Sequence, residues 1–358
     1  MTGKVLSGAR LAGIVSAVPH KTFDNINDTQ QFNSAEVKKV VALAGVKARH
    51  ISDGSICTSD LCFASAERLL RELNWSPDSV DVLICITQSP DYFLPGVSSL
   101  IHKSLGLGQN CAVFDLGLGC SGYPYGLWLA NMMVQTGSAN RVLLLHGDTP
   151  SLFTAKEDRS TYLLFGDGGT ASGIEADSTG GNWGYSLHSD GSGYSDLIIP
   201  GGGFRQRQPA RERDYCVHMH GPNLFNFTIT KVPKLIEETL ALMNVDAAQT
   251  DLFFFHQSNQ FIMKHIAKKC GLEAHKVPII LDRFGNIGGA SVPLTMTQYF
   301  MENKPQTELN VMLLGYGVGL SWASAYISID ANLCVDHVEL KDAPLASLLP
   351  NTAVETNA

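Results

Sequence analysis

Short runs of apolar residues recur along the chain and alternate with longer segments in which apolar residues return every three or four positions. The clearest runs lie at residues 11–18, 82–89, 141–147, 252–258 and 310–316. Their length and their content of Val, Ile, Leu and Phe are typical of strands buried on both faces, and the intervening segments are typical of amphipathic helices. This alternation predicts mainly parallel or mixed sheets that are covered by helices.

The pattern occurs twice. Polar positions that flank the strands recur 170 residues later, where Asn74 and Asp81 correspond to Asn244 and Asp251. The apolar run at 141–147 likewise recurs at 310–316, after a shift of 169 residues. Ordered matches of this kind indicate an internal duplication. Two similar βαβ-rich halves packed together predict an α/β fold in a five-layered α/β/α/β/α arrangement.

Composition divides the chain into four parts. We expect an N-terminal half at 1–177, a connecting region rich in Gly and Arg at 178–215, and a C-terminal half at 216–330. The remaining segment, 331–358, ends in the polar sequence NTAVETNA, and we expect a partly mobile tail there.

The overall composition excludes several classes of protein. The 358 residues are 44% hydrophobic and 17% charged, which is typical of a compact protein with a large core. A net charge of −8 argues against nucleic-acid binding, and no run approaches the roughly 20 apolar residues that a membrane span needs. The eight cysteines form no CxxC pair, so we expect reduced thiols, a cytoplasmic protein and no metal site.

One cysteine stands out by its neighbours. Residues 111–133 have the pattern of a strand, a glycine-rich turn and a helix that begins near Ser121. Cys120 then lies at a helix amino terminus, where the helix dipole favours an anion and would lower the pKa of a thiol. Most cysteines are simply small buried apolar residues, but glycines at 117, 119 and 122 allow a sharp turn and the close approach of a substrate. We therefore interpret Cys120 as a nucleophile.

The residues around Cys120 resemble those of the β-ketoacyl-acyl carrier protein synthase III family of the thiolase superfamily. Asp115 lies five residues before the cysteine, and Ser121 and Gly122 follow it. The likeness extends through the segments RSTYLLFGDGGTASG, MHGPNLFNFTI, FFFHQSN, LDRFGNIGGASVPL and GYGVGLSWASA, in the order and spacing of the family. It reaches to about Ile329 and implies the thiolase fold.

The resemblance implies roles for further residues. His256 matches the family's catalytic histidine in a His-Gln-x-Asn motif, and Asn286 matches its catalytic asparagine. Without the resemblance, His256 would be interpreted as a hydrogen-bonded core residue and Asn286 as part of a turn. The family forms its oxyanion hole from two backbone N–H groups, which here would be those of Cys120 and Val318.

Substrate contacts are implied in the same way. The family's pattern points to a substrate-binding set that consists of Phe93, Leu94, Arg159, Asn259 and Tyr316. A packed core would use many of the same residue types.

The implied chemistry needs no permanently bound cofactor, because acyl groups arrive on coenzyme A or on the phosphopantetheine of a carrier protein. The family's coenzyme A residues are partly replaced, by Lys39, Leu43 and Phe261, which leaves delivery by an acyl carrier protein open. Basic segments at 264–269 and 204–213 are candidates for contact with such an acidic carrier.

The leading hypothesis is an acyltransferase of the condensing type. An acyl thioester would be transferred to Cys120, and a malonyl-type donor on a carrier would then lose CO₂ and attack it in a decarboxylative Claisen condensation. The alternative is a specialised relative that passes the acyl group to a hydroxyl, an amine or another carbon nucleophile in a secondary-metabolite pathway. The resemblance also implies a homodimer.

Overall fold

The computed structural model describes residues 3–348, which form two large sheets and two small ribbons. One sheet has the spatial order β1 (Gly3–Leu6), β9 (Trp183–Ser189), β14 (Ser321–Ile329), β13 (Leu309–Gly317) and β12 (Leu252–Phe255). The other has the order β15 (Cys334–Leu340), β2 (Ala9–Pro19), β8 (Gly168–Ala176), β7 (Arg141–Asp148), β5 (Val82–Ile86) and β6 (Ala112–Leu116). The ribbons pair β3 (Thr22–Asp24) with β4 (Ala48–His50) and β10 (Leu197–Ile198) with β11 (His218–Met219).

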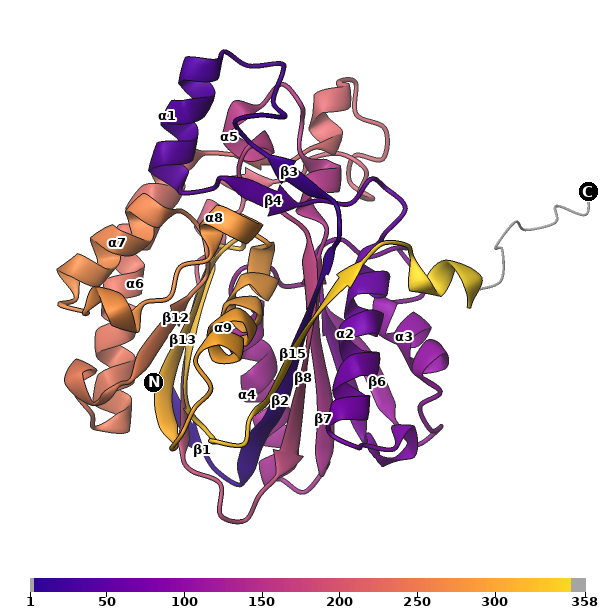
Figure 1. Cartoon of the computed structure of the whole chain (residues 1–358), viewed down its shortest axis with the longest axis vertical. Helices are drawn as coiled ribbons and strands as arrows, with labels where there is room; N and C mark the ends of the chain where they lie inside the picture. Colours follow the sequence, from indigo (N-terminus) through magenta and orange to yellow (C-terminus); the bar gives the residue numbers. More distant parts are fainter. Residues whose placement is uncertain (1–2, 349–358) are drawn as a thin grey trace, which may run out of the picture.

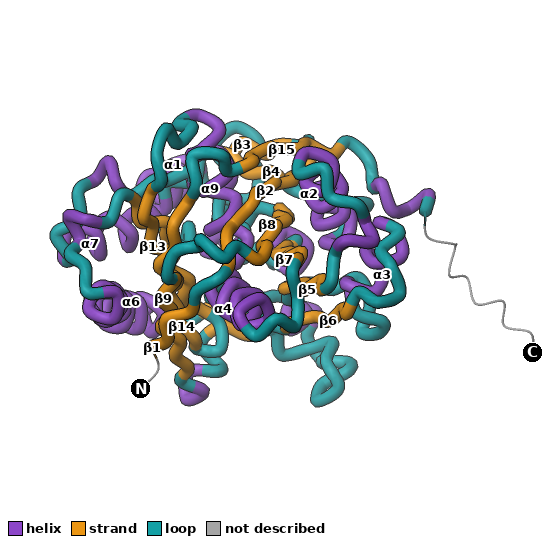
Figure 2. The backbone as a smooth tube through the Cα atoms, turned by 90° about the horizontal axis from the view of Figure 1, so that it is seen from below, coloured by secondary structure: helices purple, strands orange, loops and turns teal. Residues whose placement is uncertain are grey.

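The helices form three layers around these two sheets (Figures 1 and 2). The outer face of the second sheet is covered by α2 (Thr58–Glu72) and α3 (Val97–Leu105), and the space between the sheets holds α4 (Gly122–Gln135) and α9 (Ser291–Glu302). The outer face of the first sheet is covered by α6 (Gly221–Met243) and α7 (Gln260–Lys269). The shorter helices are α1 (Ser34–Ala44), α5 (Arg159–Tyr162) and α8 (Leu281–Phe284). The predicted five-layered α/β/α/β/α arrangement is confirmed.

The two halves share one strand topology. In the first half β2 pairs antiparallel with β8, β8 antiparallel with β7, and β7 parallel with β5. In the second half β9, β14, β13 and β12 repeat the same relations in the same order. The duplication inferred from sequence therefore extends to the order and direction of the strands.

The repeated polar positions have the same backbone role in both halves. Asn74 and Asn244 have φ values of 52° and 54°, and within residues 3–348 they are the only residues other than glycine with positive φ. Asp81 and Asp251 each accept a hydrogen bond from the backbone N–H near the start of the neighbouring parallel strand, at 3.0 and 2.7 Å. A left-handed asparagine thus ends the helix, and an aspartate joins the next two strands.

This backbone role predicts the effect of substitutions at the two asparagines. Asn74→Ala and Asn244→Ala should each lower the free energy of unfolding by about 1–2 kcal/mol, because a Cβ-bearing residue without a short polar group resists positive φ. Asn74→Gly and Asn244→Gly should be close to neutral, since glycine adopts this conformation freely. Denaturant unfolding measures all four values, and an equal loss for the Gly and Ala variants would show that the side chain matters rather than the backbone.

Two regions set apart by composition each contain a strand of a large sheet. The connecting region at 178–215 includes β9, which lies inside the first sheet between β1 and β14. The tail at 331–358 includes β15, which pairs parallel with β2 at the edge of the second sheet. Polar and glycine-rich flanks hide these strands in the sequence. Of the tail that was expected to be partly mobile, residues 349–358 lie outside the described residues.

Candidate active site

Cys120 lies between the end of a strand and the start of a central helix. Strand β6 ends at Leu116, and α4 begins at Gly122 with Ser121 as its N-cap residue. The turn is closed by a hydrogen bond of 2.7 Å from the Gly122 N–H to the Gly119 carbonyl. The helix therefore starts where the sequence predicted.

Strand β13 of the other half passes directly over the cysteine. A Cβ atom placed on Gly315 would lie 2.6 Å from the carbonyl oxygen of Cys120, and one placed on Gly317 would lie 2.8 Å from its sulfur. Real Cβ contacts are never this short, so only glycine fits at either position. These two glycines allow the second half to form one wall around Cys120.

The thiol of Cys120 does not have the lowered pKa that its position at a helix start led us to expect. Burial raises its pKa to about 11, although hydrogen bonds from the backbone at Val318 and at Cys120 itself act in the opposite direction. Desolvation of the sulfur outweighs these contributions, because a thiolate loses more hydration than a thiol. Cys120 therefore carries a protonated thiol at neutral pH.

A protonated thiol predicts the pH dependence of alkylation. The thiolate is the reactive form, so the rate of Cys120 modification by iodoacetamide should rise about tenfold with each pH unit between 7 and 10. Mass spectrometry of the peptide that contains Cys120 measures this rate. A plateau already present at pH 7 to 8 would instead show the lowered pKa that the helix dipole alone would give.

His256 follows β12 and is almost fully buried, with 2% of its surface exposed. Its backbone N–H donates to the Leu314 carbonyl at 2.7 Å, and its ring meets the Tyr316 ring edge-on at 5.5 Å. Burial lowers the pKa of His256 to about 4, while a hydrogen bond with the Gly288 backbone acts in the opposite direction. The imidazole is therefore neutral at physiological pH and can donate one ring N–H without carrying charge.

Asn286 is held by its backbone and oriented by its side chain. Its N–H donates to the Leu164 carbonyl at 2.9 Å, and its carbonyl accepts from the Gly166 N–H at 3.0 Å. The side-chain Oδ1 accepts from the Gly288 N–H at 3.0 Å. Because a backbone N–H can only donate, this bond fixes the oxygen and leaves the amide NH₂ as the outward donor.

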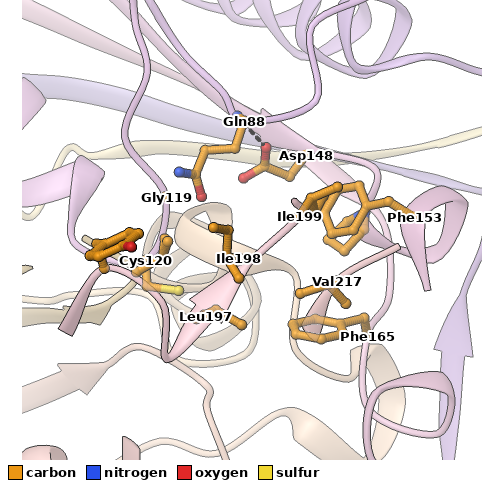
Figure 3. Close-up of a pocket in the computed structure, with 14 residues that line it drawn as sticks. Gln88, Gly119, Cys120, Asp148, Phe153, Phe165, Leu197, Ile198, Ile199 and Val217 are labelled. Atoms are coloured by element: carbon orange, nitrogen blue, oxygen red, sulfur yellow. Dashed lines mark hydrogen bonds between the residues drawn. The ribbon is translucent and has the colours of Figure 1, made fainter. Parts of the chain in front are cut away.

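Two cavities meet at Cys120. The outer one has a volume of about 530 Å³, and its lining includes Cys120, His256 and Asn286. The other, which we call the inner cavity although it is equally open to solvent, has a volume of about 350 Å³, is lined by Cys120 and Val318, and reaches the ends of β5 and β7. Figure 3 shows Gln88 and Asp148 at these strand ends. The thiol, the imidazole and the carboxamide thus face one common space, although they come from both halves of the chain.

Three of the residues predicted to bind substrate also line the outer cavity. Tyr316 is buried, and its hydroxyl donates to the His256 carbonyl at 3.2 Å. Arg159 is partly exposed and forms an ion pair with Glu36 at 2.9 Å. Asn259 caps α7, where its side-chain oxygen accepts from the Phe261 N–H at 2.9 Å. Asn259 therefore both lines the cavity and caps the start of α7.

Phe93 and Leu94 do not fulfil the expectation within a single chain. They are 75% and 80% exposed and line neither cavity. The Phe93 ring instead packs against Phe204, with ring centroids 5.5 Å apart. The loop after β5 leads to the surface here, which the motif position alone did not reveal.

The site also contains residues that the sequence analysis missed. Asp148 and Gln88 line the inner cavity, and His146 is fully buried next to it in β7. Burial raises the pKa of Asp148 to about 7, and burial together with the nearby His256 lowers the pKa of His146 to about 3. Gln88 and Asp148 follow apolar strands at their carboxyl ends, where α/β sheets bind ligands, and this signal could have identified them.

Within residues 3–348, no group of three or more His, Cys, Asp and Glu side chains is placed to hold a metal ion. Among the helices within the same range, none has the length and apolar character needed to cross a membrane.

Comparisons with known proteins identify the family. A family model described as 3-oxoacyl-(acyl-carrier-protein) synthase III matches residues 114–191, and a model of its C-terminal part matches residues 240–329. A β-ketoacyl-(acyl-carrier-protein) synthase III from Desulfitobacterium hafniense is 31% identical, over 88% of this chain and 96% of that protein. The crystal structure of a 3-oxoacyl-(acyl-carrier protein) synthase from Burkholderia xenovorans superposes with a TM-score of 0.91 and 40% identity, over 94% of this chain and 99% of that chain. The chain therefore belongs to the β-ketoacyl-acyl carrier protein synthase III family.

Proposed function

We propose that this condensing enzyme carries an acyl group on Cys120 while His256 and Asn286 stabilise the enolate of a malonyl-type donor. The observation that supports it is the common cavity onto which the three side chains open, with the NH₂ group of Asn286 left free as a donor. Membership of the family makes the protein an acyltransferase, and the division of labour among these residues is the proposal.

In the first step the Cys120 sulfur adds to the carbonyl carbon of an acyl thioester. The bond from that carbon to the carrier sulfur breaks, and the thiol proton of Cys120 ends on the departing thiol. The backbone N–H groups at Val318 and Cys120, which face the sulfur, stabilise the negative charge as it moves to the carbonyl oxygen. Each such donor contributes about 3–4 kcal/mol to lowering a barrier of this type.

In the second step the malonyl donor enters the outer cavity. Its carbon–carbon bond to the carboxylate breaks, CO₂ leaves, and the electron pair forms an enolate whose oxygen becomes negative. The neutral His256 and the outward NH₂ of Asn286 donate hydrogen bonds to that oxygen without transferring a proton. The enolate carbon then attacks the acyl carbonyl, and the Cys120 sulfur leaves as the β-ketoacyl product forms.

The outer cavity fits the arm that delivers the acyl group. Its mouth includes the exposed apolar side chains of Leu43 and Phe261, where the family pattern has arginines. Beside it, α7 carries exposed Lys264, Lys268 and Lys269, which could attract an acidic carrier protein. These features support delivery on carrier phosphopantetheine and keep coenzyme A as the second source.

Exposed apolar side chains support a homodimer. Phe93, Leu94 and Phe204 are at least 73% exposed, and the rings of Phe93 and Phe204 are in contact. Apolar groups gathered in this way usually mark an interface. In a homodimer this surface would be covered by the partner subunit.

The test supplies the protein with acyl thioesters on coenzyme A and on a carrier protein, together with malonyl-carrier protein. Release of CO₂ and a β-ketoacyl product, both identified by mass, are the expected results. Acylation of Cys120 without CO₂ release, followed by transfer to an added alcohol or amine, would support the specialised acyltransferase instead.

A further inference from the structure

The inner cavity has one polar wall in otherwise apolar surroundings. Phe165 and Val217 lie on one side of it, and Gln88 and Asp148 lie on the other (Figure 3). A cavity built only for hydrocarbon would not need a carboxyl group and a carboxamide. Asp148 is buried and loses hydration in this position, and that loss must be offset by hydrogen bonds, whereas Gln88 is exposed at the edge of the cavity.

Asp148 has one satisfied oxygen and one unsatisfied oxygen. Oδ1 accepts from the Gln88 N–H at 2.7 Å, from the Thr87 hydroxyl at 3.1 Å and from the Ser89 hydroxyl at 3.2 Å. The Ser89 backbone N–H also acts on this carboxyl, but among residues 3–348 no hydrogen bond of ordinary geometry ends on Oδ2, and 3% of the residue's surface is exposed. It faces the turn at Gly288, where a Cβ atom would lie 2.9 Å from it, and Gly288 lines the same cavity.

Gln88 places a second polar group beside the nucleophile. Its backbone N–H is bonded to Asp148, but within residues 3–348 its side-chain amide has no hydrogen-bond partner. The amide oxygen lies next to Gly119, since a Cβ atom there would be only 2.1 Å from it. Gly119 directly precedes Cys120, so the polar wall lies close to where the first carbons of a bound acyl group would be.

We propose that the acyl group accepted by Cys120 bears a hydrogen-bond donor, a hydroxyl or an amino group, which Asp148 Oδ2 accepts and which the Gln88 amide contacts as well. This inference rests on the proposed acylation of Cys120 and names the class of acyl group. A plain alkyl chain would remove water from Oδ2 and leave it unpaired, and sites built around a substrate hydroxyl discriminate strongly against analogues that lack it.

The test compares acyl thioesters that differ only by the donor. The full-length protein is incubated with four- to six-carbon acyl thioesters, each unsubstituted or with a hydroxyl or amino group at carbon 2, 3 or 4. Intact mass then gives the rate of Cys120 acylation. At least one substituted substrate should react about 10- to 100-fold faster than its unsubstituted partner. Equal or faster reaction of every unsubstituted partner overturns the inference, and no adduct from any substrate overturns the proposed function together with it.

Asp148→Asn gives a sharper control. The Gln88 N–H can only donate, so the amide oxygen of the new side chain must take the place of Oδ1, and an NH₂ group then replaces Oδ2. The preference for a hydroxyl should disappear, and the variant should favour a keto group at the same carbon.

Gln88→Leu provides an independent check, because it keeps the backbone bond to Asp148 and removes only the side-chain amide. It should reduce the preference while the thermal unfolding midpoint stays near that of the unmodified protein. If both variants keep the ratio of Cys120 acylation rates between substituted and unsubstituted substrates, Asp148 and Gln88 do not select the acyl group.

Discussion

His256→Ala and Asn286→Ala should each release CO₂ from a malonyl donor about 10²- to 10³-fold more slowly, while Cys120 still becomes acylated. The reason is that both side chains act on the enolate, a species that exists only after acylation. His256 is neutral at working pH, with its pKa lowered to about 4, and Asn286 presents its NH₂ because Gly288 holds its oxygen. Each variant therefore removes one donor from the decarboxylation step.

Two measurements on the same protein separate the steps. Intact mass gives the extent of acylation, and trapped ¹⁴CO₂ gives the rate of decarboxylation. Ser258→Ala is the matched control, because Ser258 lines the same cavity but contacts the Tyr316 hydroxyl, at 3.2 Å. The assigned role is wrong if both donor variants condense at the rate of the unmodified protein.

Gly317→Ala should lower both acylation and condensation by about 10²-fold or more, because misplacement of a reacting atom by about 1 Å costs this much. The added Cβ would lie 2.8 Å from the Cys120 sulfur, on a residue whose φ of 156° already disfavours a side chain. The sulfur must move, and every step of the reaction uses that sulfur.

The matched control is Gly117→Ala, in the turn before Cys120. A Cβ atom at Gly117 would have open space around it, and the backbone there needs no positive φ. This variant should stay within a few-fold of the unmodified activity. Circular dichroism and thermal unfolding show whether each variant is folded, and a folded Gly317→Ala protein that acylates normally would show that the sulfur has more room than the structure gives it.

The layers of the fold could be predicted because the residues that end helices and join strands recur in both halves of the sequence. Asn74 and Asn244 end helices, and Asp81 and Asp251 join strands. Both roles depend on the residue type at one position, so they can be recognised in the sequence. Strand β15 escaped prediction because its partner, β2, is more than 300 residues away. Pairing at such distance leaves no local signal.

In the candidate site, too, local features could be predicted from the sequence and features that depend on distant residues could not. The helix start after Cys120 follows from a local glycine pattern, whereas the raised pKa of the thiol follows from burial by both halves. The exposure of Phe93 and Leu94 depends on where one loop leads, and the free oxygen of Asp148 depends on which donors reach it. Tertiary packing decides these properties, and a motif does not record them.

Identification of the acylated residue tests the central claim most directly. The protein is incubated with an isotopically labelled acyl thioester and digested, and each cysteine-containing peptide is analysed by mass. We expect the acyl mass on Cys120 and on none of the other seven cysteines. A label found on another cysteine, or no covalent adduct with any acyl thioester tested, would contradict it.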